Sequence, residues 1–425
     1  MTDHNHFQGI EWLGMGFRVP RHWEIVRHSV NPEKGHLAFV DRRHQRLLWS
    51  WAASPAIPDT RQLLADYQAR DLETSETCRF ESLEPTSSWR GYRCLDSSPE
   101  KTRAVRYDHG AGRWVEITLT WPEGLERQCE QQILDSFRMQ APAEPQHWQA
   151  FQLSVTAPAG WTLERARVKP ADVSFRFGHG RQKALVRRRG MADVWFDGDL
   201  RAFLRQHVPE RIQDVETRTC ASREAVFGTS REPGTRLKRV LKRLRRRKDL
   251  VWLDSEARAL IQVTTLAPQQ DPLEPDMFEA ETANQGTGSA PQPGRQATQE
   301  ESGLTWAGVL DAVPMHNQAA RTEASDKDAT VVYVPVRKRW FNGPPFTWLL
   351  PLRNEKRYVL DPVGAEVWRA CDGRTTVEVI VEGFARRHRV TFHEARVQVL
   401  QFMKSLMENA MLVAVSQPQA RRTAP

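Results

Sequence analysis

Hydrophobic and polar residues alternate with a period of two in two separate parts of the chain, which predicts half-buried β-strands there. The alternating segments are Leu37–Val40, Arg46–Trp51, Val173–Phe177 and Ala184–Arg187. In each part an apolar run at helical spacing follows a capping residue, Asp59 in the first and Asp197 or Asp199 in the second. Each part then closes with another strand-like run that ends in a proline, Pro122 or Pro268. The order of expected elements is therefore the same in both.

The two parts also open in the same way, with a proline three residues before a tryptophan. These pairs are Pro20 with Trp23 and Pro158 with Trp161. We expect a tandem duplication of one α+β unit, with sandwich-like α/β repeats over residues 1–145 and 146–268. The opening of the second repeat, Pro-Ala-Gly-Trp, loosely resembles that of the PsbP-like α/β/α fold.

The composition changes after the second repeat. Asp271–Asp328 contains 11 acidic and 3 basic residues, and Gly286–Gly294 is rich in glycine and proline. We expect residues 269–328 to be an acidic flexible linker, whose apolar island Leu304–Leu310 is either a docked helical turn or a stray patch. The chain carries +8 and this segment −8, so the remainder carries +16. A basic body favours anionic partners: nucleic acid, an acidic peptide or the linker itself.

Three short strand-like runs and then three helical runs follow the linker. The expected strands are Val334–Trp340, Phe346–Leu352 and Lys356–Leu360, with the turn Asn342–Pro345 between the first two. The expected helix boundaries are Asp361 with Pro362 and Gly373 for the first helix, Thr375 or Thr376 for the second, and the capping box Thr391 with Glu394 for a third helix that reaches about Met411. This pattern predicts a small winged-helix-like domain over residues 329–416 and a disordered tail over residues 417–425.

The sequence of this last domain is similar to that of the PqqD family. The matching runs are Val359–Trp368, Cys371–Gly373, Thr375–Val381 and Val399–Leu406, in that order. The resemblance extends over residues 333–415. It implies a recognition element for ribosomally made, post-translationally modified peptides, in which the leader segment of a precursor adds a strand to the exposed edge of the third strand and lies against the third helix.

By this resemblance, the candidate peptide-binding residues lie on the third strand and the third helix. They are Arg357, Tyr358, Val359, Leu360, Arg396, Leu400, Met403, Lys404 and Met407. The residue types suit this role, because an edge strand offers unpaired backbone groups and flexible methionines adapt to different ligands. For Met403 and Met407, ordinary packing in the core is an equal alternative.

A strongly basic segment, Arg236–Lys248, is a candidate anion-binding site. Its candidate residues are Arg236, Lys238, Arg239, Lys242, Arg243, Arg245, Arg246 and Arg247. Apolar residues from Leu237 to Leu244 recur at helical spacing, so a helix here would be basic on one face and apolar on the other. Three interpretations stay open: a solvated hairpin insert, pairing with the acidic linker, or binding of an external anion such as a phosphate backbone or an anionic lipid.

Sequence signatures of catalysis are missing. There is no phosphate-binding loop and no nucleophile elbow, and His393-Glu394 belongs to a helix cap rather than to a zinc-protease helix. We therefore predict no metal site and no cofactor. The scattered cysteines, Cys78, Cys94, Cys129, Cys220 and Cys371, are expected to be free thiols in a reducing cytoplasm. The N-terminus lacks the features of a signal peptide, and no apolar run is long enough for a membrane span.

The sequence thus favours a non-catalytic peptide-binding adaptor that presents a precursor peptide to a separate modifying enzyme. By family resemblance, that enzyme is often a radical S-adenosylmethionine protein. The alternative is a nucleic-acid-binding winged-helix protein that uses the basic segment 236–248. Apolar residues on the third helix speak against a DNA reader, whose recognition helix should be polar and basic. An enzyme in the duplicated region, with a site assembled from distant residues, is a third interpretation.

Overall fold

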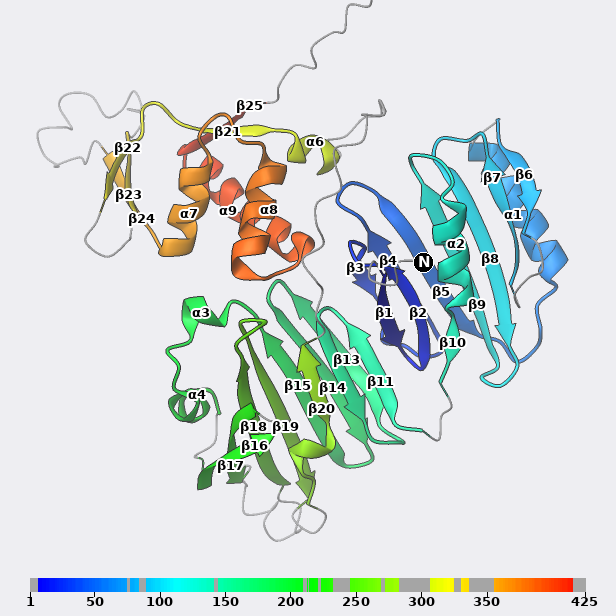
Figure 1. The fold of residues 1–425 in the computed structure, drawn as a ribbon, viewed down its shortest axis with the longest axis horizontal. Helices are drawn as coiled ribbons and strands as arrows, with labels where there is room; N and C mark the ends of the chain where they lie inside the picture. Colours follow the sequence, from blue (N-terminus) through cyan, green and yellow to red (C-terminus); the bar gives the residue numbers. More distant parts are fainter. Residues whose placement is uncertain are drawn as a thin grey trace, which may run out of the picture. The chain divides into compact units, whose positions relative to one another are not determined.

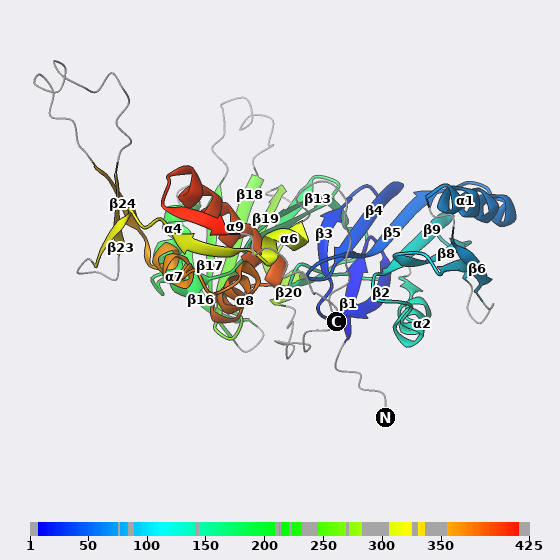
Figure 2. The same cartoon turned by 90° about the horizontal axis from the view of Figure 1, so that it is seen from above.

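The chain divides into two compact units, residues 1–299 and 300–425, in the computed structural model (Figure 1). The structure describes residues 7–74, 77–83, 89–140, 144–208, 212, 214–220, 223–231, 245–268, 272–282, 306–324, 330–335 and 355–415. Strands dominate the first unit, whereas helices form much of the second (Figures 1 and 2). No helix within these ranges is long and apolar enough to cross a membrane.

The first unit consists mainly of antiparallel strands. Its first half contains β1 (Phe7–Trp12), β2 (Met15–Pro20), β3 (Glu24–His28), β4 (Lys34–Val40), β5 (Gln45–Ala53), α1 (Thr60–Thr74), β6 (Arg79–Ser82), β7 (Arg90–Leu95), β8 (Glu100–Asp108), β9 (Arg113–Trp121), α2 (Arg127–Asp135) and β10 (Arg138–Met139). Its second half contains β11 (Gln146–Ala150), β12 (Leu153–Ala157), β13 (Thr162–Lys169), β14 (Asp172–His179), β15 (Gln182–Arg189), α3 (Ala192–Trp195), α4 (Leu200–His207), β16 (Asp214–Cys220), β17 (Arg223–Arg231), β18 (Arg245–Asp254), β19 (Ala259–Pro268), the 3-10 turn η2 (Pro275–Met277) and β20 (Glu279–Thr282).

Three sheets organise these strands. Sheet B has the order β3-β4-β5-β9-β8-β7-β6, and sheet C has the order β13-β14-β15-β19-β18-β17-β16. The two orders correspond strand for strand, and in both sheets the connection from the third strand to the far edge carries helix. Sheet A has the order β10-β2-β1-β11-β12-β20, so β1 of the first half pairs with β11 of the second. The duplication with its exact bounds, and the likeness to the PsbP-like fold, stay predictions.

The two halves share one hydrophobic core, because residues from all three sheets belong to a single buried cluster. Trp12 on β1 lies at their junction. Its ring meets those of Trp148 and Phe175 edge to face, with both centroid distances at 5.6 Å. Its indole N–H donates to the Ser29 carbonyl over 2.8 Å. The expected repeats at residues 1–145 and 146–268 are therefore parts of one compact unit rather than separate domains.

The prediction of a flexible linker over residues 269–328 is wrong for two segments. Residues 272–282 contain η2 and β20, and β20 pairs with β12. Residues 306–324 contain α6 (Trp306–Leu310), β21 (Val313–His316) and β22 (Arg321–Ala324) of the second unit. Leu310 is fully buried, so the apolar island is docked. The segment Gly286–Gly294 and the tail 417–425 lie outside the described residues.

The described residues of the second unit form two small sheets and three longer helices. The elements that follow β22 are β23 (Thr330–Pro335), β24 (Glu355–Leu360), α7 (Pro362–Ala370), α8 (Val377–His388), α9 (Phe392–Glu408) and β25 (Leu412–Val415). The sheets have the orders β22-β23-β24 and β21-β25. The first expected strand overlaps β23 at Val334 and Pro335, while its residues 336–340 lie outside the described part of the chain, and the third is confirmed as β24. The second expected strand and the turn Asn342–Pro345 lie outside the described residues.

Local capping chemistry sets the starts of α7 and α9 as predicted, whereas Thr376 takes the N-cap position of α8 without a side-chain capping hydrogen bond. The Asp361 carboxylate accepts a hydrogen bond of 2.6 Å from the Gly364 N–H at the start of α7. Beyond its end, Gly373 has φ +78°, a left-handed conformation that favours glycine. Thr391 and Glu394 form both hydrogen bonds of a capping box at the start of α9.

Two further sequence expectations need correction. Cys78 and Cys94 are joined in a disulfide, so these two are not free thiols, while Cys129 and Cys371 are free. The thiol argument for a reducing compartment does not hold for the bonded pair. The carboxyl-terminal part of the basic segment, Arg245–Lys248, begins strand β18 instead of ending a helix. These residues pair with β19 in antiparallel register, so this part of the segment is a strand.

Candidate functional site

Strand β24 lies at an edge of its sheet, since within the described residues it pairs only with β23. Register places Pro335 opposite Glu355. Because proline has no N–H, this cannot be a position where two residues exchange both backbone hydrogen bonds. The alternation of an antiparallel ladder then directs the N–H and C=O groups of Arg357 and Val359 outward. These two residues provide the backbone groups that an added strand would bind.

The side chains of β24 are divided between its two faces. Tyr358 turns toward the end of α9, where its hydroxyl donates to Asn409 Oδ1 over 3.0 Å. Leu360 is buried on the same face. Val359 lies on the opposite face and is 59% exposed. Of the four predicted strand residues, Tyr358 contacts the residue that follows α9, Leu360 is part of the core, and Arg357 and Val359 lie on the other face.

Helix α9 contributes four of its five predicted residues to a partly open stripe. Arg396, Leu400, Lys404 and Met407 follow one another at intervals of four, four and three residues, which puts them on one side of the helix. Met407 is 43% exposed, and Leu400 is half-buried. Met403 is only 3% exposed, so for this residue the alternative of core packing is correct.

The charged side chains of this stripe are basic, and one of them, Lys404, lies 3.9 Å from the Glu408 carboxylate. Burial lowers the pKa of His393 to about 4, and the adjacent Arg396 guanidinium adds to the effect. The two side chains lie 2.5 Å apart at their nearest nitrogens, so the imidazole is neutral at pH 7. Lys356 and Arg357 on β24 are exposed. The edge and the stripe are therefore suited to a peptide with carboxylate side chains.

One residue outside the predicted domain, His316, packs against its helices. His316 on β21 stacks on Trp368 of α7, with ring centroids 3.9 Å apart, and its Nε2 lies 2.7 Å from the Trp368 carbonyl. Gly364 of α7 lies close to the Phe402 ring of α9. Sequence reasoning missed His316 and Asn409. Asn409 follows the last turn of α9, a place where asparagine is frequent, but nothing local indicates its contact with Tyr358.

The predicted anion-binding residues form no single site within the described part of the chain. Arg236, Lys238, Arg239, Lys242 and Arg243 lie outside it, and the side chain of Arg245 is not described. Arg247 binds Asp249 with two hydrogen bonds, of 2.8 and 3.0 Å. Lys248, the last residue of the basic segment, forms an ion pair with Glu274. One contact between the basic segment and the acidic segment is therefore present.

Comparison with known proteins identifies only the second unit. No curated protein matches the chain. Among solved structures, the WD40 domain of SCAP from fission yeast is similar at 8% identity over 62% of this chain and 72% of that one, with a TM-score of 0.10. That likeness carries no argument about the fold. Residues 347–412 match the family model of coenzyme PQQ synthesis protein D (PqqD), which confirms the resemblance predicted for the carboxyl-terminal region.

Proposed function

We propose that this protein is a non-catalytic adaptor that binds a ribosomally made precursor peptide and presents it to a separate modifying enzyme. The peptide adds a strand to β24 and packs against α9. The observation that carries the proposal is the outward-facing backbone of Arg357 and Val359 on an edge strand inside the region that matches PqqD. PqqD domains are peptide-binding recognition elements without catalytic activity of their own.

The edge of β24 and the stripe of α9 would contribute different parts of recognition. Backbone hydrogen bonds along β24 supply sequence-independent affinity, as in other cases of strand addition. Leu400 and Met407 supply an apolar wall, and Arg396 and Lys404 attract acidic side chains. Holding the peptide near an enzyme raises its effective concentration at the active site, so the adaptor needs no chemistry of its own. A radical S-adenosylmethionine enzyme is the partner that the family suggests.

The first unit, in this proposal, is a duplicated scaffold that docks the enzyme or a larger assembly. The equal strand orders of sheets B and C support the duplication, with β1–β2 and β11–β12 as corresponding hairpins. The short strands β22–β24 followed by three helices support a winged-helix-like description of the second unit. A cytoplasmic location accords with the proposed peptide substrate.

The test uses the full-length chain, with Val359→Pro against Val359→Thr. Proline removes the outward N–H of Val359 and leaves the ladder to β23 intact, whereas threonine keeps that N–H and the β-branched shape. Both proteins are first compared by circular dichroism and then used to capture peptides from cells that express the neighbouring genes. We expect the threonine variant to retain a precursor peptide and the proline variant to lose it. Equal capture by both variants would contradict strand addition at this edge.

A further inference from the structure

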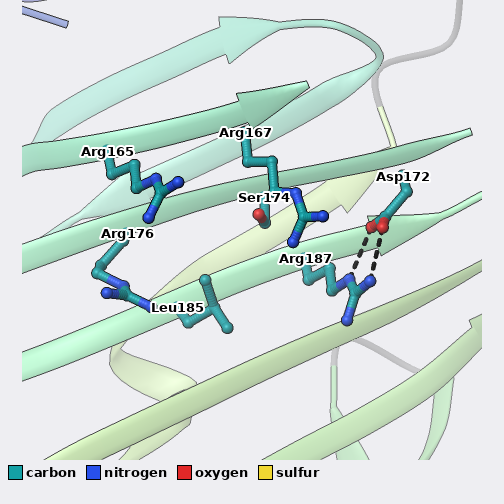
Figure 3. Close-up of a pocket in the computed structure, with 7 residues that line it drawn as sticks. All are labelled: Arg165, Arg167, Asp172, Ser174, Arg176, Leu185 and Arg187. Carbon is teal, nitrogen blue, oxygen red and sulfur yellow. Dashed lines mark hydrogen bonds and ion pairs between the residues drawn. The ribbon is translucent and has the colours of Figure 1, made fainter. Parts of the chain in front are cut away.

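A group of arginines gathers on the outer face of sheet C in the first unit. Arg165 and Arg167 on β13, Arg176 on β14 and Arg187 on β15 line a hollow of about 150 Å³ together with Asp172, Ser174 and Leu185 (Figure 3). The register places Arg165 opposite Arg176, and Arg176 opposite Leu185. The same face continues to Lys169 and Arg189 in the next row. The rows from Arg165 to Lys169 span about 13 Å at about 3.3 Å per residue.

Most of this positive charge is not neutralised. Arg187 is bound by Asp172 through two hydrogen bonds, of 2.7 and 2.6 Å. Among the described residues, no carboxylate oxygen lies within 4 Å of a guanidinium nitrogen of Arg165, Arg167 or Arg176. The buried Nε of Arg189 also has no hydrogen-bond partner in the described part of the chain. Several donors therefore face the same side of the sheet with no acceptor.

The electrostatic environment agrees with this geometry. Burial would raise the pKa of Asp172, but hydrogen bonds from Arg187 and the charges of Arg187, Arg189 and Arg167 outweigh it, so the pKa is lowered. Burial, and then the positive charge of Arg187, lower the pKa of Arg189. One carboxylate is thus shared among several cations, and a second anion would be stabilised here.

The fold itself requires few of these arginines, because sheet B has the same strand order and keeps only one of them, with Arg27 at the place of Arg165. The central pairs Trp49–Ile117 of sheet B and Val186–Val263 of sheet C take corresponding places. With these matched, Ala38 takes the place of Arg176, Ser50 that of Arg187, and Ala52 that of Arg189. Like charges on adjacent strands are destabilising, so a role in binding accounts for them better than a role in stability.

An exposed aromatic residue borders the basic face. Trp195 on α3 is 41% exposed, and its indole N–H donates to the Gly190 carbonyl over 2.9 Å at the end of β15. The Arg189 guanidinium lies 5.8 Å from its ring centroid. A basic surface that tracks a backbone and an aromatic ring that can stack on a base are together typical of single-stranded nucleic-acid binding.

We propose that the outer face of β13–β15 binds the phosphate backbone of a single nucleic-acid strand, with Arg165, Arg167 and Arg176 as phosphate ligands and Trp195 at one end. Arginine suits this role, because its planar fork donates two parallel hydrogen bonds to a phosphate. The face is about two phosphates long, so the contact is short and independent of base sequence. It lies in the first unit and does not depend on the proposed peptide site.

The experiment measures binding of a fluorescein-labelled 12-nucleotide oligothymidylate to the full-length chain by anisotropy, at several salt concentrations. The variant R165T/R176T removes two exposed arginines of the proposed face. The matched control R27T/R90T removes two exposed arginines from strands of sheet B and changes the net charge equally. We expect R165T/R176T to bind more than about tenfold more weakly than the control at low salt. The slope of log K against log salt should fall by about 1.4, since each phosphate contact of a single strand contributes about 0.7.

Three outcomes decide the proposal. R165K/R176K keeps the two charges, and its binding close to that of the wild type would support phosphate contacts and show that the strands tolerate substitution. Equal affinity of R165T/R176T and R27T/R90T would overturn the proposal, because general charge would then account for binding. Displacement of the oligonucleotide by an equal charge concentration of polyglutamate would also overturn it, since the face would then select carboxylates of an acidic peptide.

Discussion

Helix α1 is held on sheet B by a buried charge, and neutralising that charge should release it. All fifteen residues of α1 are described, and Asp71 is its one fully buried side chain, at 3% exposure. The carboxylate accepts hydrogen bonds from Arg103 over 2.8 and 2.9 Å and from the Tyr92 hydroxyl over 2.7 Å. Tyr67 of α1 adds a hydrogen bond of 2.5 Å to Glu116. Polar contacts thus replace the apolar face that anchors most surface helices.

The size of the effect follows from these contacts. Asp71→Asn keeps the shape of the side chain but removes its charge and leaves the Arg103 guanidinium with a weak partner. Loss of one member of a buried ion pair costs about 3–5 kcal/mol. The Arg103 side chain is 26% exposed, so water compensates in part. We expect a loss of about 2–3 kcal/mol in the free energy of unfolding. Since 1.4 kcal/mol is a factor of ten, hydrogen exchange in α1 should accelerate about 30- to 140-fold.

Urea denaturation and hydrogen exchange with mass spectrometry measure both quantities. The control is Asp66→Asn, the same chemical change on the exposed side of α1, which should alter stability by less than about 0.5 kcal/mol. Burial alone would raise the pKa of Asp71, but the hydrogen bonds from Arg103 and Tyr92 lower it by more, so its folded-state pKa lies below the ordinary value. The stabilisation is therefore present above about pH 4 and lost as the pH falls through the folded-state pKa. If D71N matched D66N in both assays, the polar anchor would be refuted.

Two further predictions concern the second unit. Gly364→Ala would place a Cβ 2.8 Å from the Phe402 ring and 2.9 Å from the Asp361 carboxylate, so we expect the free energy of unfolding in urea to fall by about 1–2 kcal/mol. Gly383→Ala in α8 has open space around it and should raise that free energy by about 0.5–1 kcal/mol. A G364A variant as stable as the wild type would contradict the close packing. Burial lowers the folded-state pKa of His393 from 6.5 to about 4. The contribution of the neutral imidazole to the free energy of unfolding is therefore complete above pH 6.5, and up to about 3 kcal/mol of it is lost as the pH falls toward 4. The stability difference between wild type and His393→Gln should shrink over that range, and a constant difference would exclude a buried neutral imidazole.

Local chemistry in the sequence was enough to place several elements of the second unit. Asp361, Gly373 and the Thr391–Glu394 box each satisfy backbone groups of their own helix, and such contacts depend on residues within a few positions. β24 and the PqqD match were likewise read from contiguous residues. The period-two pattern also located strands in both halves of the first unit, since alternation reports which side of a strand is buried.

Contacts between distant residues were decided only by the tertiary structure. The pairing of β1 with β11, of β12 with β20 and of β21 with β25 joins segments that no local period connects. The same holds for Met403, whose burial depends on the elements that cover α9, and for Arg245–Lys248, whose pairing with β19 no local period indicates. The arginines of β13–β15 come together only because register aligns them on one face. Sequence fixes which local conformations are stable, but long-range pairing chooses the partners, because its energy comes from burial and hydrogen bonds shared between segments far apart in the chain.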